Sequence, residues 1–254
     1  MRLLVLNPNT TAAVTERLTA AAQAVAAPGT ELVPLTATRG VPYIATLAEA
    51  QIGGAIALEM LAEHHADVDA VIIAAFGDPG LFGARELFDI PVIGMSEAAM
   101  LTACMLGRRF SIVTFAQALG GWYRDCVEMH GLRDRCCSVR MLDQSFASIA
   151  DVQEEKEELL VALANKAVAE DDAEVVILGG APLAGLADKI RERVAVPLVD
   201  PIAAAVKQAE AIVTLAPRKA IAGTFRRPAA KSTRGLADKL AIRIEHRDNP
   251  SVGG

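Results

Sequence analysis

Three short turns contain the residues of this sequence that could carry out chemistry together. The first runs from Asn7 to Thr10 and offers two amides and a hydroxyl. The second, Ala75 to Gly80, carries the carboxylate of Asp78, and the third, Gly179 to Gly185, carries no titratable side chain. Free backbone N–H groups at the start of a helix bind anions and carbonyl oxygens, so each turn could hold an oxyanion.

Ordinary turn and capping chemistry is the alternative explanation for these turns. Asp78 directly precedes Pro79, a pair that suits a helix capped by Asp78 and beginning at Pro79. Gly77 and Gly80 would let the backbone approach a ligand closely. The pattern by itself leaves both interpretations of Asp78 open.

The sequence contains no P-loop, no dinucleotide-binding turn, no serine-hydrolase elbow, no zinc-protease motif and no CxxC pair. His64 and His65 close a predicted helix, where a cation meets the favourable end of the helix dipole. His130 and His246 lie in polar stretches, which we expect to be away from the three turns. We therefore predict no metal site.

Short apolar runs alternate with helix-length segments, which predicts an α/β fold whose largely parallel sheets are covered on both faces. The runs expected to form strands are 3–6, 31–35, 70–75, 91–94, 110–114, 138–142, 175–178 and 197–199. The segments expected to form helices are 11–26, 47–64, 97–106, 152–170 and 202–215. Thr10, Thr11 and Asp151 are candidate helix caps.

The two halves of the sequence repeat one order of elements. Residues 70–77 read as a strand and a glycine turn, and the apolar strand 90–94 and an alanine-rich helix follow. Residues 174–180, 196–200 and 202–206 repeat this order. Either all βαβ units look alike, or the chain forms two similar lobes with a ligand between them, at the carboxyl ends of the strands.

Composition excludes several classes of protein. The 254 residues are 52% apolar and 22% charged, which excludes a disordered chain. A net charge of −6 argues against a general nucleic-acid binder. No apolar run approaches the roughly 18 residues of a membrane helix. We therefore expect a cytoplasmic protein that binds neither nucleic acid nor membrane.

The chain from Pro217 onward differs in composition from the rest. It gathers basic residues and is interrupted by a second proline, Pro228. The segment could be a basic binding patch. We expect instead a solvated tail that packs over the lobes or against a second subunit of a homo-oligomer.

At these turns and strands the sequence resembles the aspartate/glutamate/hydantoin racemase superfamily, and within it the hydantoin and allantoin racemase branch. The matching segments are Asn7–Thr10, Phe76–Gly80, Pro91–Met100, Arg109–Thr114, Val176–Gly179 and Val196–Pro201. The resemblance implies two similar Rossmann-like α/β lobes, related by a pseudo-twofold axis, with the active site in the cleft between them. We expect residues 1–97 and about 205–254 to form the first lobe and the tail, and residues 98–204 the second lobe.

The resemblance also implies a cofactor-independent reaction with one cysteine in each lobe. One thiolate would remove the proton from the substrate's α-carbon, and the other thiol would return a proton from the opposite face. The matching positions in this sequence are Ala75 and Gly180, so the two-thiol mechanism cannot operate as it stands. Ala75 alone could be an engineered replacement, whereas the motif around Gly180 reads as native. The cysteines that the chain does have are expected to be structural: Cys104, Cys126, Cys136 and Cys137.

We expect an isomerase, by resemblance, that acts next to a carbonyl of a small carboxylate or a hydantoin-like cyclic amide. Backbone and hydroxyl donors would hold the enolate-like state. The alternatives are a decarboxylase or other lyase, a ring-opening C–N hydrolase, or a protein that binds a small molecule without turnover. Asp78 is the candidate base or water-orienting group, Asp200 lies at a similar strand end, and Glu97 is expected to cap or bridge the start of its helix. The candidate substrate-binding residues are Asn9, Thr10, Tyr43, Phe76, Gly77, Ser96, Thr114, Ala181 and Pro182.

Overall fold

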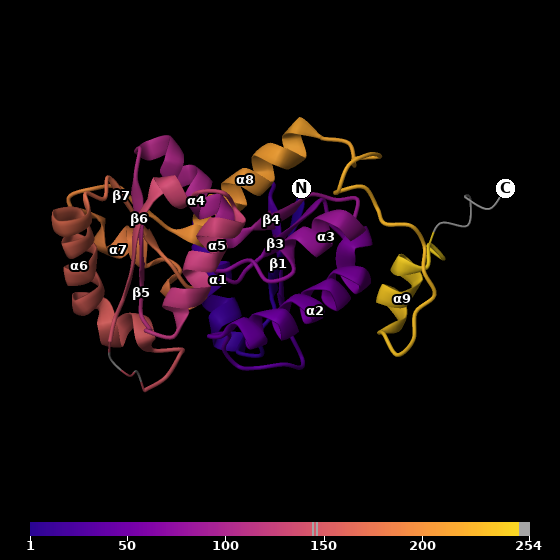
Figure 1. Ribbon diagram of the computed structural model, residues 1–254, viewed down its shortest axis with the longest axis horizontal. Helices are drawn as coiled ribbons and strands as arrows, with labels where there is room; N and C mark the ends of the chain where they lie inside the picture. The colour runs from indigo at the N-terminus through magenta and orange to yellow at the C-terminus, as the bar shows by residue number, and fades with distance from the viewer. Residues whose placement is uncertain (144, 146, 249–254) are drawn as a thin grey trace.

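The computed structural model describes residues 1–143, 145 and 147–248, and shows two four-stranded parallel sheets side by side (Figure 1). Their strand orders are β2-β1-β3-β4 and β6-β5-β7-β8. The strands are β1 (Arg2–Asn7), β2 (Glu31–Thr36), β3 (Ala70–Ile73), β4 (Val92–Gly94), β5 (Phe110–Thr114), β6 (Cys136–Met141), β7 (Val175–Leu178) and β8 (Leu198–Val199). The two orders correspond position by position, so the prediction of two similar α/β lobes is confirmed.

Helices cover both faces of each sheet. They are α1 (Ala12–Val25), α2 (Leu47–His64), α3 (Leu81–Leu87), α4 (Met95–Leu106), α5 (Leu119–Met129), α6 (Val152–Asp171), α7 (Leu186–Ile190), α8 (Pro201–Leu215) and α9 (Asp238–Ile244). The sequence prediction gave no range for α5, α7 or α9. Thr11 and Asp151 stand at the N-cap positions of α1 and α6, but neither side chain makes a capping hydrogen bond.

All eight predicted strands are present, because a parallel sheet covered on both faces needs nearly continuous apolar runs. The residues of β3 and β7 are all buried, and β1 is buried except at Arg2. The largest differences from the predicted bounds are two residues. β3 ends at Ile73, so Ala74 and Ala75 belong to the following turn, and β6 begins at Cys136.

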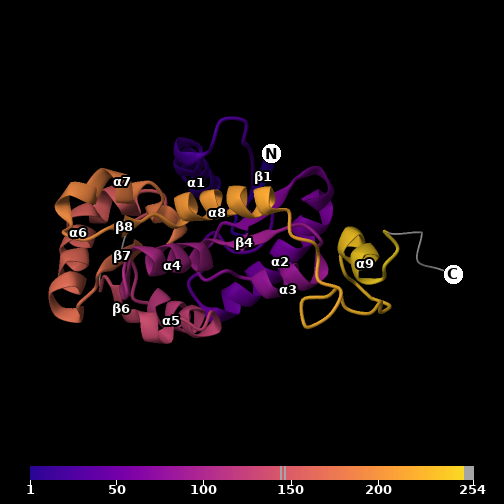
Figure 2. The ribbon, with the colours of Figure 1, turned by 90° about the horizontal axis from the view of Figure 1, so that it is seen from above.

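Two helices exchange between the lobes and join them into one core. α4 follows the last strand of the first sheet but packs on β7 of the second, whereas α8 follows β8 and packs on β3 and β4. The two helices also pack on each other in the middle of the molecule (Figure 2). The side-chain amide of Gln208 on α8 donates to the carbonyl of Ala98, at 2.9 Å, and to the hydroxyl of Thr102, at 3.1 Å, both on α4. Neither sheet is therefore covered without the other half of the chain.

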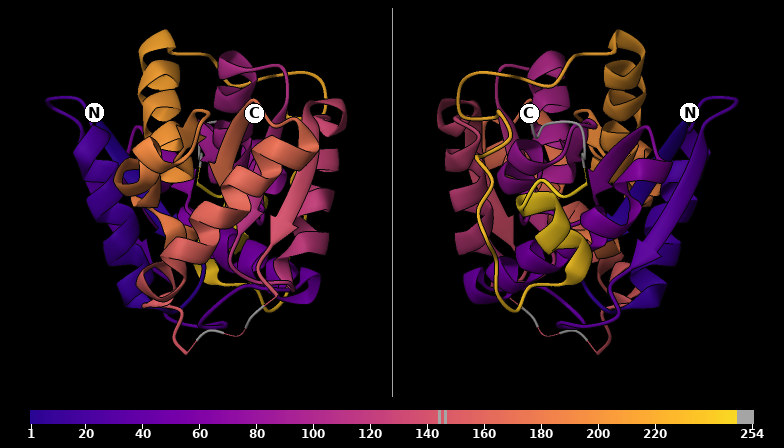
Figure 3. Two further views of the ribbon diagram at one scale, coloured as in Figure 1. Left: turned by 90° about the vertical axis from the view of Figure 1, so that its left-hand side faces the viewer. Right: turned by 90° about the vertical axis from the view of Figure 1, so that its right-hand side faces the viewer.

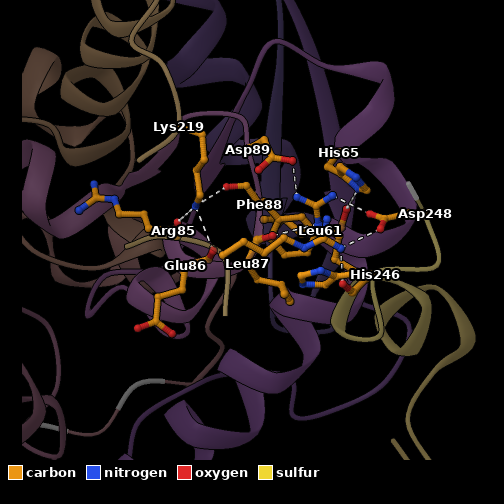
Figure 4. A network of polar contacts seen from close by, with 12 residues as sticks. Leu61, His65, Arg85, Glu86, Leu87, Phe88, Asp89, Lys219, His246 and Asp248 are labelled. Carbon is orange, nitrogen blue, oxygen red and sulfur yellow. Dashed lines mark hydrogen bonds and ion pairs between the residues drawn. The ribbon is translucent and has the colours of Figure 1, made fainter. Parts of the chain in front are cut away.

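The basic tail packs over the first lobe, where α9 lies against α2 (Figure 3). The ammonium group of Lys219 donates to three carbonyls at the end of α3, those of Arg85, Glu86 and Phe88 (Figure 4). The guanidinium of Arg243 is buried over the Phe88 ring and donates to the carbonyl of Leu87 at 2.9 Å. Lys219 and Arg243 therefore bind the protein itself, whereas other basic residues of the tail are exposed: Arg218, Arg226, Lys231, Arg234 and Lys239.

None of the helices in the described ranges is both long and apolar enough to cross a membrane.

Replacing Lys219 with Met tests how the tail is held. The change leaves the carbonyls at the end of α3 without their cationic donor, so we expect the free energy of unfolding to fall by about 1–2 kcal/mol. Urea denaturation followed by circular dichroism measures this. Lys231→Met, at an exposed position of the same tail, is the matched control and should shift stability by less than about 0.5 kcal/mol. Equal effects of the two changes would show that the contacts of Lys219 do not hold the tail.

Candidate functional site

A small cavity lies where the carboxyl ends of the central strands of both sheets meet. Asn9 follows β1, Phe76 follows β3, Phe115 follows β5, and Gly180 follows β7. The cavity lining contains seven residues that the sequence analysis singled out: Asn9, Tyr43, Ala75, Phe76, Gly180, Ala181 and Pro182. Strand ends of this kind are the usual ligand sites of α/β proteins, so this cavity is the candidate functional site.

Aromatic side chains form much of this cavity, and three of them, Phe115, Trp122 and Tyr123, were not among the residues predicted from the sequence. Both tyrosines of the chain, Tyr43 and Tyr123, and its single tryptophan, Trp122, line it together with Phe76 and Phe115. The rings pack on one another, with centroids 4.6 Å apart for Phe76 and Tyr123. Aromatic residues are only 4% of the chain, so their position in the segments that follow strands was a usable signal.

The aromatic rings leave little free space in the cavity. Its volume is about 20 Å³, which is room for about one water molecule. A ligand the size of a five-membered ring therefore enters only when the rings or the lobes move apart.

The two phenols of the cavity are protonated at neutral pH. Burial raises the pKa of Tyr43 well above its usual value, and the charge of Glu49 raises it further. Burial likewise raises the pKa of Tyr123 well above its usual value, and the neighbouring hydroxyl of the buried Thr114 lowers it by less. Phenols in this state donate hydrogen bonds and are poor bases.

The first turn is held by its own amides. Asn7 Nδ2 donates to Asn9 Oδ1 at 3.2 Å, and the N–H of Thr11 donates to the same oxygen at 3.0 Å. The N–H of Asn9 donates back to Asn7 Oδ1, and that of Thr10 donates to the carbonyl of Val41. Thr10, which was predicted to bind substrate, is not part of the cavity lining. Asn9 is part of the lining, and its side-chain amino group is the donor that this turn can offer to a ligand.

The second and third turns each contribute a residue to the cavity lining, Phe76 and Ala181. In the described part of the chain, the N–H groups of Phe76 and Ala181 donate to no other backbone carbonyl. They follow β3 and β7, which occupy equivalent positions in the two sheets. A ligand oxygen between the lobes could accept hydrogen bonds from both sides.

Asp78 has a different structural role from the predicted one. α3 begins at Leu81 with Gly80 as its N-cap residue, so the prediction that Asp78 caps this helix is wrong. The turn places Asp78 at a positive φ of 51° and directs its carboxylate to α4 instead. Asp78 Oδ1 accepts from the N–H of Ser96, and Oδ2 accepts from that of Glu97, both at 2.8 Å. The carboxylate is fully buried and is not part of the aromatic cavity.

His130 lies next to Asp78, which corrects the prediction that this histidine is remote from the turns. His130 Nε2 is 3.0 Å from Asp78 Oδ2, and its side chain is 3% exposed. Burial lowers the pKa of His130, but hydrogen bonds with Asp78, Cys126 and Glu97 outweigh burial and raise it to about 11. The two contact residues are 52 positions apart, and no sequence pattern indicated the pair.

Glu97 is part of the same buried network and does not cap its own helix. Its carboxylate pairs with the guanidinium of Arg85, with one hydrogen bond at 2.9 Å, and lies 3.5 Å from Nδ1 of His130. Burial raises the pKa of Glu97, but the hydrogen bonds with His130 and Arg85 lower it to about 2. Glu97 is therefore ionised at neutral pH.

The remaining candidates support the turns from behind. Ser96 is buried and its hydroxyl accepts a hydrogen bond from the N–H of Gly77. Gly77 has a φ of 106°, and a side chain there would overlap the Trp122 indole. Asp200 accepts from the N–H groups of Gly185, Ile202 and Ala203, so it joins the third turn to the start of α8. These contacts position the cavity wall without bringing another carboxylate into it.

Gly180 occupies a backbone conformation that excludes most side chains. Its φ is 129°, and a Cβ atom would lie 2.8 Å from Cε1 of Phe115. Ala75 already carries a Cβ in the cavity wall and shows no positive φ. The two positions that lack thiols therefore differ, because the backbone at Gly180 is adapted to glycine.

Paired substitutions test this difference. Gly180→Ala should lower the free energy of unfolding by about 2–4 kcal/mol, since it combines backbone strain with overpacking against Phe115. Ala75→Cys, which keeps an allowed backbone, should change it by no more than about 1 kcal/mol. Chemical denaturation of both variants decides the matter. A Gly180→Ala protein as stable as wild type would contradict the observed backbone conformation.

Replacing Asp78 tests the buried network. Asp78→Ala leaves the His130 side chain buried beside an incomplete set of partners and removes the acceptor of two N–H groups, so unfolding should require about 3–5 kcal/mol less. Asp125→Ala, at an exposed position on α5, is the control and should shift stability by less than about 0.5 kcal/mol. A loss below about 1 kcal/mol for Asp78→Ala would rule out this carboxylate as the group that joins the turn to α4 and α5.

Comparison with known proteins places these features in context. The family model for Asp/Glu/Hydantoin racemase matches residues 3–209. A hydantoin racemase of Pseudomonas sp. (strain NS671) is 33% identical over 241 residues, which cover 94% of this chain and 97% of the relative. The solved structure of an allantoin racemase from Klebsiella pneumoniae has a TM-score of 0.89 and 36% identity, and covers 94% of this chain and 98% of its own. An allantoin racemase from Pseudomonas fluorescens has a TM-score of 0.86 and 37% identity, covering 92% of this chain and 100% of its own.

Proposed function

Because the chain belongs to the Asp/Glu/hydantoin racemase family, we propose that it binds a small cyclic amide or carboxylate between its lobes and acts on the carbon next to a carbonyl. The observation that carries this proposal is the cavity at the carboxyl ends of the central strands, with backbone donors from both lobes. The names of the racemase relatives give hydantoin and allantoin as their substrates, and both compounds are cyclic amides.

The chemistry of the cavity suits a planar amide ring. Aromatic side chains form apolar walls on which a flat ring packs well, and a few polar groups fix its orientation. In this proposal the N–H groups of Phe76 and Ala181 and the amide of Asn9, all three residues of the lining, donate to the ring's carbonyl oxygens. Donors of this kind stabilise the negative charge that develops on a carbonyl oxygen when the neighbouring carbon loses a proton.

The chemistry cannot depend on a pair of thiols, since Ala75 and Gly180 stand at the two matching positions. The described lining contains no carboxylate, and its titratable groups are the protonated phenols of Tyr43 and Tyr123. We assign these phenols, with the backbone N–H groups, to stabilising the enolate-like state. We assign the transfer of the α-carbon proton to water that enters with the ligand, which accepts the proton and returns one to the planar carbon. Asp78, the base suggested from sequence, is engaged behind the wall by α4 and His130 and is not assigned that role.

Incubation with hydantoins and allantoin in D₂O tests the proposal. We expect the α-carbon proton to exchange for deuterium, followed by NMR, and the ligand to raise the melting temperature of the protein. Asn9→Ala should weaken binding about tenfold, a loss of about 1.4 kcal/mol for one polar contact. Gln51→Ala, an exposed amide on α2, is the control and should leave affinity unchanged.

Other outcomes of the same experiment identify the other reaction classes. Release of CO₂ or a ring-opened product without exchange at the α-carbon would replace the isomerase assignment with a lyase or a hydrolase. Thermal stabilisation with no chemical change would identify a binding protein. Neither stabilisation nor turnover with any cyclic amide or small carboxylate would refute the proposed substrate class.

A further inference from the structure

We propose that Asp78, Cys126 and His130 form a binding site for a divalent transition-metal ion of the zinc class, and that this ion bridges the two lobes. One ligand atom from each of the three side chains lies within 4.8 Å of the other two. The site is separate from the aromatic cavity, whose lining includes none of these three residues.

The spacing of the donors is close to that of a tetrahedral site. His130 Nε2 and Asp78 Oδ2 are 3.0 Å apart. Zinc binds nitrogen and oxygen at about 2.0 Å, so two such ligands of a tetrahedral ion lie about 3.3 Å apart. A displacement of a few tenths of an ångström between the turn and the helix would admit the ion.

The types of donor select the class of metal. A thiolate, an imidazole and a carboxylate together favour zinc, cobalt and similar ions over magnesium or calcium, which prefer oxygen ligands only. Asp78 and the thiolate form of Cys126 supply two negative charges, which a divalent cation neutralises. Binding releases the thiol proton and any proton on Nε2 to solvent, since both atoms must be free to coordinate the ion.

The elements that carry the three donors are already held in place. Cys126 lies in α5 and His130 directly follows this helix, four residues later, so both side chains lie on one helix face. Asp78 comes from the turn after β3 of the first sheet and is oriented by the N–H groups of Ser96 and Glu97. The ion would therefore connect a turn of the first lobe to a helix of the second.

The surroundings of His130 match those of a metal-binding histidine. Its other ring nitrogen, Nδ1, lies 3.5 Å from the carboxylate of Glu97, which Arg85 holds in turn. Histidines that bind metals usually donate this second N–H to a carboxylate or a carbonyl, which orients the ring. The Glu97–His130 pair supplies this second interaction.

Access to the site comes from a larger cavity between α2 and α5. This cavity has a volume of about 400 Å³ and is lined by Asp78 and Cys126, together with Leu47, Leu58 and Trp122 among others. It offers room for a water molecule as a fourth ligand.

A buried network of side chains that share protons is the competing explanation for the proximity of Asp78, Cys126 and His130. This explanation predicts no affinity for metal.

Titration of the metal-free protein with Co²⁺ distinguishes the two explanations. We expect one equivalent to bind and to produce the near-ultraviolet charge-transfer band of a cobalt–thiolate bond. Cys126→Ser should abolish this band, and His130→Ala should weaken Co²⁺ binding at least tenfold, with circular dichroism to confirm folding. The double variant Cys136→Ser/Cys137→Ser is the matched control, since it removes two neighbouring thiols elsewhere, and it should keep the band.

X-ray absorption at the zinc edge of the wild-type protein gives an answer even if a variant fails to fold. We expect one sulfur ligand, with nitrogen and oxygen completing the coordination. Absence of the cobalt band, a band that survives Cys126→Ser, or two sulfur ligands in the absorption spectrum would each overturn the proposal.

Discussion

The buried carboxylate of Asp78 is the interaction on which the arrangement of the two lobes depends. It follows a strand of the first sheet, accepts two N–H groups from the start of α4, and contacts His130 at the end of α5. Removing a charge from water is costly unless hydrogen bonds and an opposite charge compensate it. Here the start of α4 supplies the hydrogen bonds, and the cationic His130 supplies the charge. The turn is consequently held in a positive-φ conformation that an aspartate rarely adopts.

This network determines the shape of the candidate site. With Gly77 held against Ser96, the Trp122 indole packs directly on the glycine backbone. On the other side of the cavity, Phe115 packs in the same way on Gly180. Each glycine allows an aromatic ring to approach the backbone where a side chain would prevent it. The result is an aromatic cavity whose described lining contains no carboxylate.

The exchange of α4 and α8 joins the two halves of the chain into one fold. Each helix covers the sheet of the other half, so the hydrophobic core runs continuously through both lobes. This core depends on apolar volume and not on the two cavity positions, Ala75 and Gly180. The family's fold can therefore be retained while the chemistry at the strand ends changes.

The succession of strands and helices along the chain, the two similar lobes and the turns of the cavity were predictable from the sequence, because each depends on local pattern. Parallel strands require apolar runs, and the turns that follow them carry glycine and amides. The tertiary structure decided which of these groups meet. Asp78 reads as a local helix cap, yet its partners come from α4 and from His130, 52 residues away. The aromatic lining likewise comes from segments that have no common motif. Sequence spacing reports on neighbours along one element, whereas a buried charge is paired by whatever the packing of distant elements brings to it.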